Sequence, residues 1–456
     1  MASDIERDDA APARGLRARL HRLLERNGYT IAAADQLSLS LFNFVLNIVL
    51  LRLLAPAQFG VVSLWSAVSQ LSIGVQNAAI GMPLSVHVPA TSDEAAGRRL
   101  EDALGTINLG LVLLSVAAVV AVNGLTDAEW TPPTFAVAIA IPLFIATNLY
   151  REFYRSAAFG RRDMLMLILI DGPYLAVTAA CLVVMLVWPE RFGGLFEAFL
   201  ALSAGCVVSQ LCLSRRLARR PLHLFRRGWT QTYRSILGEV WWSLVGVIAT
   251  FVVGRCYIYL ATALAGLTAL AAINAVGILF RPVSVLMTAW GRLALPHLAE
   301  AWARADTGAF RRDLLRALGV ALAGSIAWAV VLWLAWSVIE RTLLAGKYPE
   351  GYRLLLPWAL CSTLAVQEYI VGIALNAARE FRFLAYTQML GGVVAMSATA
   401  GLILAGGYTW TMYGVAIGDA FCLALEVVQL TLLWRAAARP RPAGFGLGAP
   451  ARSNGP

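Results

Sequence analysis

Two arginines lie inside long apolar stretches, where a charged side chain is energetically costly unless it faces water or a partner of opposite charge. Arg281 is the centre of a stripe of polar or small residues spaced by three and four positions: Asn274, Gly277, Arg281, Ser284 and Thr288. On a helix this spacing places all five on one face. Because guanidinium groups suit phosphate, we expect Arg281, Arg255 and Asn274 to bind an anionic group in a hydrated cavity. The alternative is structural pairing of the arginines with acidic residues, namely Glu239, Asp171 or Glu368.

Carboxylates also lie within the apolar stretches. Asp171 precedes Gly172 and Pro173, while Asp419 and Glu426 stand seven positions apart on one helical face. A carboxyl group in such surroundings can bind and release a proton or another cation. We therefore expect coupling to protons or sodium at one or more of Asp171, Glu239, Glu368, Asp419 and Glu426. The alternative is that these groups bond within the helix bundle, and Asp171 to backbone groups that Pro173 frees.

The first apolar stretch carries a polar stripe of its own: Gln36, Ser40, Asn43 and Asn47. Glu239, Ser243, Gly246 and Thr250 repeat its spacing 203 positions later, from Gln36 to Glu239. The stripe occupies one helical face. We expect Gln36, Asn43 and Asn47 to line the same cavity as the arginines, and the repeat predicts two parallel halves.

Twelve apolar stretches position these residues. They cover residues 35–54, 59–82, 105–123, 134–154, 164–188, 195–214, 237–262, 265–290, 317–339, 354–377, 382–406 and 409–434. About 20 apolar residues cross a bilayer as a helix, whereas membrane strands would need alternating polarity. With 59% hydrophobic and 14% charged residues, the composition excludes a soluble domain. The sequence predicts an all-α polytopic membrane protein of about 12 transmembrane helices in two six-helix halves.

The arginines and lysines predict the orientation in the membrane. Of 37 such residues, 30 lie in the termini and the even-numbered connections, five at the odd-numbered connections, and Arg255 and Arg281 within spans. This asymmetry places both termini in the cytoplasm and excludes nucleic acid as the reason for the net charge of +10. The predicted segments are a cytoplasmic segment at 1–34, the first half at 35–214, a basic loop at 215–236, the second half at 237–434 and a disordered tail at 435–456.

No motif for enzymatic chemistry stands out. GxSxG, HExxH and Walker A sequences do not occur, and the six Cys fall in apolar spans without a CxxC pair. We expect no catalytic residue, no metal site and no organic cofactor. Without a P-loop, uphill transport would need an ion gradient or a pull from later steps.

Three further stretches resemble a known family. Leu54-Ala-Pro-Ala-Gln-Phe-Gly60 matches the L-x-P-x-x-[FY]-G junction of polysaccharide and oligosaccharide-lipid flippases, which belong to the multidrug/oligosaccharidyl-lipid/polysaccharide (MOP) exporter superfamily. Leu343-Leu-Ala-Gly-Lys-Tyr348 and Ala374-Leu-Asn-Ala-Ala-Arg379 agree with it. The resemblance covers essentially the whole chain.

The resemblance implies two six-helix lobes around a central cavity that opens alternately to each side of a bacterial inner membrane. The cargo would be a polyprenyl-pyrophosphate-linked glycan, and polysaccharide polymerase or export machinery would be the partner. Family members commonly have a positive cavity, which maps onto Arg255 and Arg281 by location. One alternative is an ion-coupled drug or small-solute antiporter of the same superfamily or of the major facilitator type. Another is a membrane-embedded enzyme such as a glycan polymerase.

Overall fold

The computed structural model describes residues 28–90, 93–125, 134–161, 163–219, 222–304 and 306–437. These residues form helices joined by short connections, with no strand among them. Residues 1–27 of the predicted cytoplasmic segment lie outside the described residues, as does the tail from residue 438.

The first half of the chain forms one helical lobe, the N-lobe. Its elements are α3 (Gly28–Leu53), α4 (Pro56–Gln76), the π-helix η1 (Asn77–Gly81), α5 (Met82–Ala90), α6 (Glu94–Leu125), α7 (Phe135–Gly160), α8 (Met164–Val187), α9 (Pro189–Phe192) and α10 (Leu195–Arg219). Local sequence sets several boundaries. Pro56 starts α4, because its fixed φ suits the first helical turn. Asp163 caps α8 by accepting a hydrogen bond from the Met166 amide at 2.9 Å.

The second half forms the C-lobe. Its elements are α12 (Leu237–Ala303), α13 (Thr307–Leu334), α14 (Trp336–Thr342), η2 (Pro349–Gly351), α15 (Tyr352–Ala377), α16 (Phe381–Gly406), η3 (Tyr408–Trp410) and α17 (Thr411–Ala437). The short helix α11 (Trp229–Arg234) precedes it. α12 is two helices in one, because Gly266 breaks it with a positive φ of 85°. We call the parts before and after Gly266 its first and second arms.

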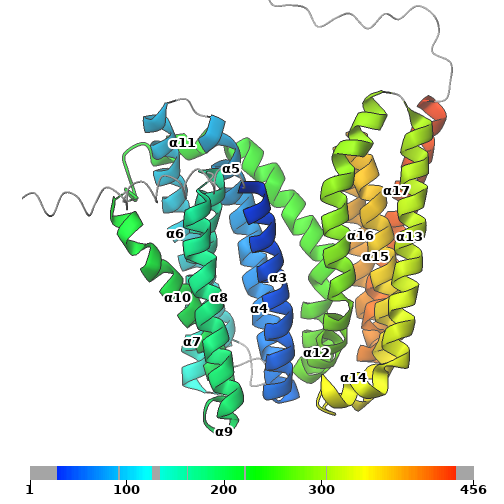
Figure 1. Ribbon diagram of the computed structural model, residues 1–456, viewed down its shortest axis with the longest axis horizontal. Helices are drawn as coiled ribbons and strands as arrows, with labels where there is room; N and C mark the ends of the chain where they lie inside the picture. Colours follow the sequence, from blue (N-terminus) through cyan, green and yellow to red (C-terminus); the bar gives the residue numbers. More distant parts are fainter. Residues whose placement is uncertain are drawn as a thin grey trace, which may run out of the picture.

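Figure 1 shows the two lobes side by side, with α12 between them and its kink at the lower end. The start of α3, the helix α11 and the end of α17 all lie at the upper end of this view. The segments that the arginine count assigns to the cytoplasm therefore share one end of the molecule. We call it the predicted cytoplasmic end, and the end near Gly266 the predicted outer end.

The all-helical, two-lobed architecture is confirmed, and the helix boundaries differ in places. Eleven helices among the described residues are long and apolar enough to cross a membrane, with a shorter apolar helix at Leu237–Val252. The count of twelve therefore stays a prediction. The predicted basic loop at 215–236 is partly helical, because it contains the end of α10 and all of α11. The predicted tail begins as helix, since α17 continues to Ala437.

The first arm of α12 packs against the N-lobe as well as against its own lobe. α12 as a whole contacts α4 and η1 of the N-lobe and α15 and α16 of the C-lobe. On the first arm, Val247 and Phe251 lie against Gly74 of α4, and Tyr257 lies against Trp358 of α15. The Ser243 hydroxyl on this arm donates to the Met82 sulfur at 3.1 Å. α12 is thus the element that both lobes share.

Two contacts at the predicted outer end hold the lobes together. A Cβ atom on Gly60 would lie 2.1 Å from the carbonyl oxygen of Leu267, so α4 and α12 meet backbone to backbone. The Lys347 ammonium donates to the carbonyl oxygens of Arg52 and Leu54, the latter at 2.8 Å. Carbonyls at a helix C-terminus lack intrahelical donors and attract a cation. Burial, together with the charge of Arg52, lowers the pKa of Lys347.

Candidate functional site

The two intramembrane arginines come together between the arms of α12. Arg255 precedes Gly266 by 11 residues and Arg281 follows it by 15. These separations place the arginines about 16 and 22 Å from the kink along the two helix axes. Each positive charge acts on the other and on Tyr257, so the three side chains share one region. The Tyr257 hydroxyl donates to the Asn274 amide oxygen at 3.0 Å. Three predicted site residues, Arg255, Arg281 and Asn274, therefore form one cluster, which we call the α12 cation pair.

The α12 cation pair has no carboxylate partner within the described part of the chain. No ion pair joins Arg255 or Arg281 to an acidic side chain there. Arg281 is exposed and Arg255 is half-buried. The alternative that Arg255 and Arg281 pair with acidic residues does not hold for the described residues. The acids proposed as their partners bond to other side chains, namely Glu239, Asp171 and Glu368. Two guanidinium groups without a carboxylate partner are a candidate site for an anion, and the binding role predicted for them stays a prediction.

Aromatic packing fixes the face of the second arm that carries Asn274 and Arg281. The Trp358 indole of α15 donates to the Ile273 carbonyl at 2.8 Å. Its ring lies edge-on to Tyr257 at 6.0 Å and stacks with Phe280 at 6.3 Å. A Cβ atom on Gly277 would lie 2.4 Å from this ring, which explains the small residue in the predicted stripe. The stripe is therefore held in place by an indole ring on one side.

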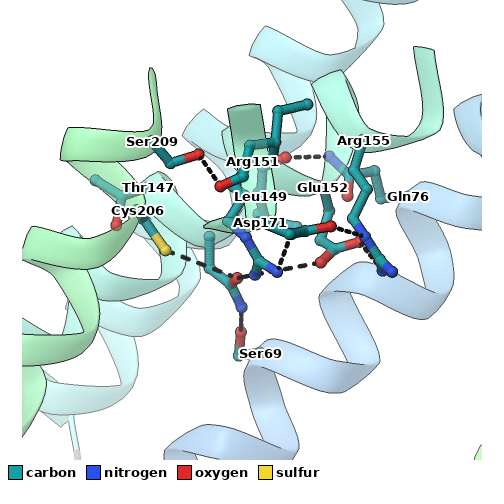
Figure 2. Close-up of polar contacts among 12 residues, drawn as sticks. Ser69, Gln76, Thr147, Leu149, Arg151, Glu152, Arg155, Asp171, Cys206 and Ser209 are labelled. Carbon is teal, nitrogen blue, oxygen red and sulfur yellow. Dashed lines mark hydrogen bonds and ion pairs between the residues drawn. The ribbon is translucent and has the colours of Figure 1, made fainter. Parts of the chain in front are cut away.

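A second charged cluster lies inside the N-lobe (Figure 2). Asp171 of α8 is 1% exposed and accepts from Arg151 at 2.7 Å and from Arg155 at 2.8 Å, both on α7. Arg155 also donates to Asp35 at 3.0 Å and to Gln36 at 3.2 Å, both on α3. Asp171 is thus bonded to two guanidinium groups, and this network ties three helices together.

Sequence reasoning missed the two cations of this network. We counted Arg151 and Arg155 with the basic connection after the fourth span, but α7 continues to Gly160 and Arg151 is only 5% exposed. One signal was available. A carboxylate in mid-span needs a cation, and two arginines four positions apart on a neighbouring helix share one face.

Three carboxyl groups lie on neighbouring helices inside the C-lobe. Glu368 of α15 accepts a hydrogen bond from Gln388 of α16, and its charge acts on Asp419 and Glu426 of α17. Glu426 is 1% exposed, and neither of its carboxyl oxygens has a hydrogen-bond partner among the described residues. No ion pair to a basic side chain is found for these three acids in the described ranges. They are suited to hold a proton, because a buried carboxyl group without a cation is costly when charged.

Four other predicted site residues make no hydrogen bond or ion pair to the α12 cation pair or to the C-lobe acids in the described part of the chain. The Glu239 side chain is 75% exposed and lies 3.0 Å from the His87 imidazole near the predicted cytoplasmic end. Asn43 is exposed, and the Asn47 amide donates to the Asn43 carbonyl at 2.6 Å, within α3. Gln36 joins the N-lobe network through Arg155. The roles predicted for Gln36, Asn43, Asn47 and Glu239 stay predictions.

The fold is found in solved membrane transporters. An inward-facing multidrug resistance MATE family transporter of the MOP superfamily aligns with a TM-score of 0.62 at 14% identity, covering 87% of this chain and 95% of that one. The lipid II flippase MurJ in an inward closed conformation aligns with a TM-score of 0.67 at 9% identity, covering 86% and 87%. A D35N mutant of the Vibrio cholerae MATE transporter VcmN aligns with a TM-score of 0.56 at 14% identity, covering 91% and 98%.

Searches of family models and of curated proteins found no match. The structural likeness defines the class of protein as a multi-pass membrane protein with a transporter or flippase fold. More narrowly, it is the fold that MATE transporters and MurJ share within the MOP superfamily. At these identities the comparison establishes the fold, and the cargo is a separate question.

Proposed function

We propose that this protein flips a polyprenyl-pyrophosphate-linked oligosaccharide or polysaccharide repeat unit from the cytoplasmic to the outer leaflet of a bacterial inner membrane. The observation that carries the proposal is the α12 cation pair. Arg255 and Arg281 lie on the two arms of a kinked helix, close enough for their charges to interact, without a carboxylate partner among the described residues. A pyrophosphate supplies the missing negative charge, with oxygens spaced for bidentate guanidinium bonds.

The physical task explains why a cation pair at this depth is useful. A glycan and a pyrophosphate carry many polar groups that hydrocarbon does not solvate, so the bare bilayer is a high barrier. The lipid tail needs no such help and stays among the acyl chains. A hydrated, cationic passage between two lobes therefore lowers the barrier for the headgroup alone. The protein acts as a transporter and leaves the covalent bonds of its cargo unchanged.

Alternating access is the mechanism that the fold favours. In the observed conformation the lobes meet at the predicted outer end, through Gly60 with Leu267 and through Lys347 with Leu54. The solved relatives with which the fold agrees well include an inward-facing transporter and an inward closed flippase. We infer that the headgroup enters from the cytoplasm in this state, and that both termini lie on that side. Glycosyltransferase products would supply the cargo, and polymerase or export machinery would take it up.

A second candidate function is supported by the C-lobe acids. Three carboxyl groups without a basic partner in the described residues, Glu368, Asp419 and Glu426, could couple transport to protons. No group of three or more His, Cys, Asp or Glu side chains among those residues is placed to hold a metal ion. Such coupling fits a drug or small-solute antiporter as well as a flippase. The two functions differ in cargo, so the test must follow the cargo.

The test is flipping of lipid-linked glycan by the purified protein in proteoliposomes. We expect Arg281→Ala to slow flipping about 10- to 150-fold, because one or two charge-assisted hydrogen bonds to the pyrophosphate are lost. Arg281→Lys keeps the charge without the bidentate geometry and should fall between Arg281→Ala and the parent. Arg341→Ala, an exposed arginine at the predicted outer end, is the matched control. A parent protein that exports a cationic drug and flips no lipid-linked glycan would establish the antiporter instead.

A further inference from the structure

A pocket in the cytoplasmic half of the N-lobe borders the charged cluster around Asp171 and shares Arg155 with it. Its volume is about 380 Å3. One wall is η1 and α5, and the other is α7. The polar side chains that line it are Asn77, Ser85, Glu152, Arg155 and Ser156, and Phe159 adds an aromatic ring. Pockets for small molecules commonly have volumes of about 300–1,000 Å3 and a few polar groups of this kind.

The π-helical turn η1 shapes the first wall. It inserts one wide turn, Asn77–Gly81, between α4 and α5. Single π-turns inside α-helices occur frequently at functional sites, because they redirect side chains that a regular helix would turn away. A Cβ atom on Gly81 would lie 2.7 Å from the Asn77 amide oxygen and 3.2 Å from the Ser156 hydroxyl. The glycine therefore keeps room for polar groups from both walls.

Several of these polar groups have unused hydrogen-bonding capacity. The side chains of Asn77, Ser85 and Ser156 make no hydrogen bond to another residue in the described part of the chain. Glu152 lies 3.4 Å from Arg151 and 3.6 Å from Arg155, which leaves its carboxylate free to accept further bonds. An amide and a hydroxyl both donate and accept, and a carboxylate only accepts. The pocket thus presents a mixture of donors and acceptors, which sugar hydroxyl groups match because each does both.

The charge around the pocket distinguishes it from the α12 cation pair. Arg151 and Arg155 are surrounded by three acids, Asp35, Glu152 and Asp171. The formal balance is one negative charge, so the pocket does not attract a pyrophosphate. A neutral ring with hydroxyl edges and an apolar face fits better. The Phe159 ring, which lies 5.5 Å from the Arg155 guanidinium carbon, offers a surface for that apolar face.

We propose that this pocket binds a neutral sugar residue of the cargo, while the α12 cation pair binds its pyrophosphate. The inference rests on the proposed function and deepens it, because it assigns the two halves of one headgroup to different sites. The N-lobe then selects the glycan, and α12 holds the part that every polyprenyl-pyrophosphate cargo shares.

The experiment compares two synthetic probes that share a polyprenyl pyrophosphate and differ by one neutral hexose, either glucose or galactose. Binding to the full chain in detergent is measured by native mass spectrometry. Ser85→Tyr fills the pocket, and Ser38→Tyr makes the same change at an exposed position of α3 outside it. We expect Ser85→Tyr to weaken binding of the glycosylated probe about tenfold, the loss of one or two net hydrogen bonds, and to leave the bare pyrophosphate probe unaffected.

The other outcomes separate the two claims. If the parent binds both probes equally, or if Ser85→Tyr retains the parent's preference for the glycosylated probe, the sugar pocket is refuted and the flippase stands. If the parent binds neither probe, the proposed function fails. Ser85→Ala, which keeps the pocket open, guards against misfolding as the cause of a loss. It should bind the glycosylated probe within about threefold of the parent, as expected for one lost hydrogen bond.

Discussion

Gly60 controls the contact that closes the predicted outer end, and replacing it should open that end. A Cβ atom there would lie 2.1 Å from the Leu267 carbonyl oxygen, whereas real Cβ contacts essentially never fall below 3.0 Å. In Gly60→Ala the two backbones must therefore separate by about 0.9 Å, the difference between these distances. The Leu267 oxygen belongs to the backbone and cannot rotate away as the end of a flexible side chain would, so the helices themselves must move. Overpacking of this kind costs about 1–3 kcal/mol.

This cost falls on the outer-closed state alone, so it shifts the conformational equilibrium. A difference of about 1–3 kcal/mol changes the ratio of outer-closed to outer-open molecules about 5- to 150-fold. Spin labels on Arg52→Cys and Arg353→Cys, both exposed at the predicted outer end, report the separation of the lobes by electron–electron double resonance. The six native cysteines are replaced first. We expect the parent to show one short distance and Gly60→Ala to populate a longer one.

The control is a glycine-to-alanine change where space is open. Gly254 lies on the first arm of α12, and a Cβ atom there would meet nothing within 4 Å. Gly254→Ala should leave the distance distribution as in the parent. If Gly60→Ala also leaves it unchanged, the contact between α4 and Leu267 does not close the outer end and the reasoning is wrong.

Three further predictions follow from contacts elsewhere in the molecule. Lys347→Met removes the donor that bonds to the end of α3, so the same spin labels should show roughly a tenfold increase in the population with the longer distance. An unchanged population would contradict the role of Lys347. Asp171→Asn leaves Arg151 and Arg155 without their shared carboxylate and should lower stability by about 3–5 kcal/mol in denaturant unfolding, and a variant as stable as the parent would count against the network. Glu426→Gln should abolish the response of transport to an imposed proton gradient in proteoliposomes while lipid-linked probes still bind, and an unchanged response would exclude Glu426 from coupling.

The fold was predictable because the membrane imposes it. Long apolar stretches must form helices in hydrocarbon, and the arginines between them mark one side, so the all-helical membrane fold followed from composition and spacing, while the two lobes were implied by the family resemblance. The meeting of Arg255, Arg281 and Asn274 was predictable for a related reason. Charged and polar groups buried in a membrane need a common wet or polar space, and two adjacent spans are neighbours in most membrane folds.

Other features depended on information that spacing does not contain. The pairing of Asp171 with Arg155 requires knowing where α7 ends, and helix ends several residues beyond a span are poorly marked in a charged connection. The kink at Gly266 merges two predicted spans, because a single glycine with positive φ reverses the chain without a polar loop. Glu239 is separated from the C-lobe acids because it lies on the first arm of α12, beside His87 of the N-lobe. The sequence of this arm does not reveal which lobe it packs against.

The kink at Gly266 has a mechanical consequence for the proposed transport cycle. Arg255 and Arg281 are attached to opposite sides of the same bend, so any rocking of one lobe against the other alters the angle between the arms and hence the span between the two guanidinium groups. An anion bridging them resists that change, and an empty site permits it. Binding of the anion and the angle between the lobes are therefore coupled. In the proposed cycle, binding and release of the cargo would themselves trigger the change between the two lobe arrangements.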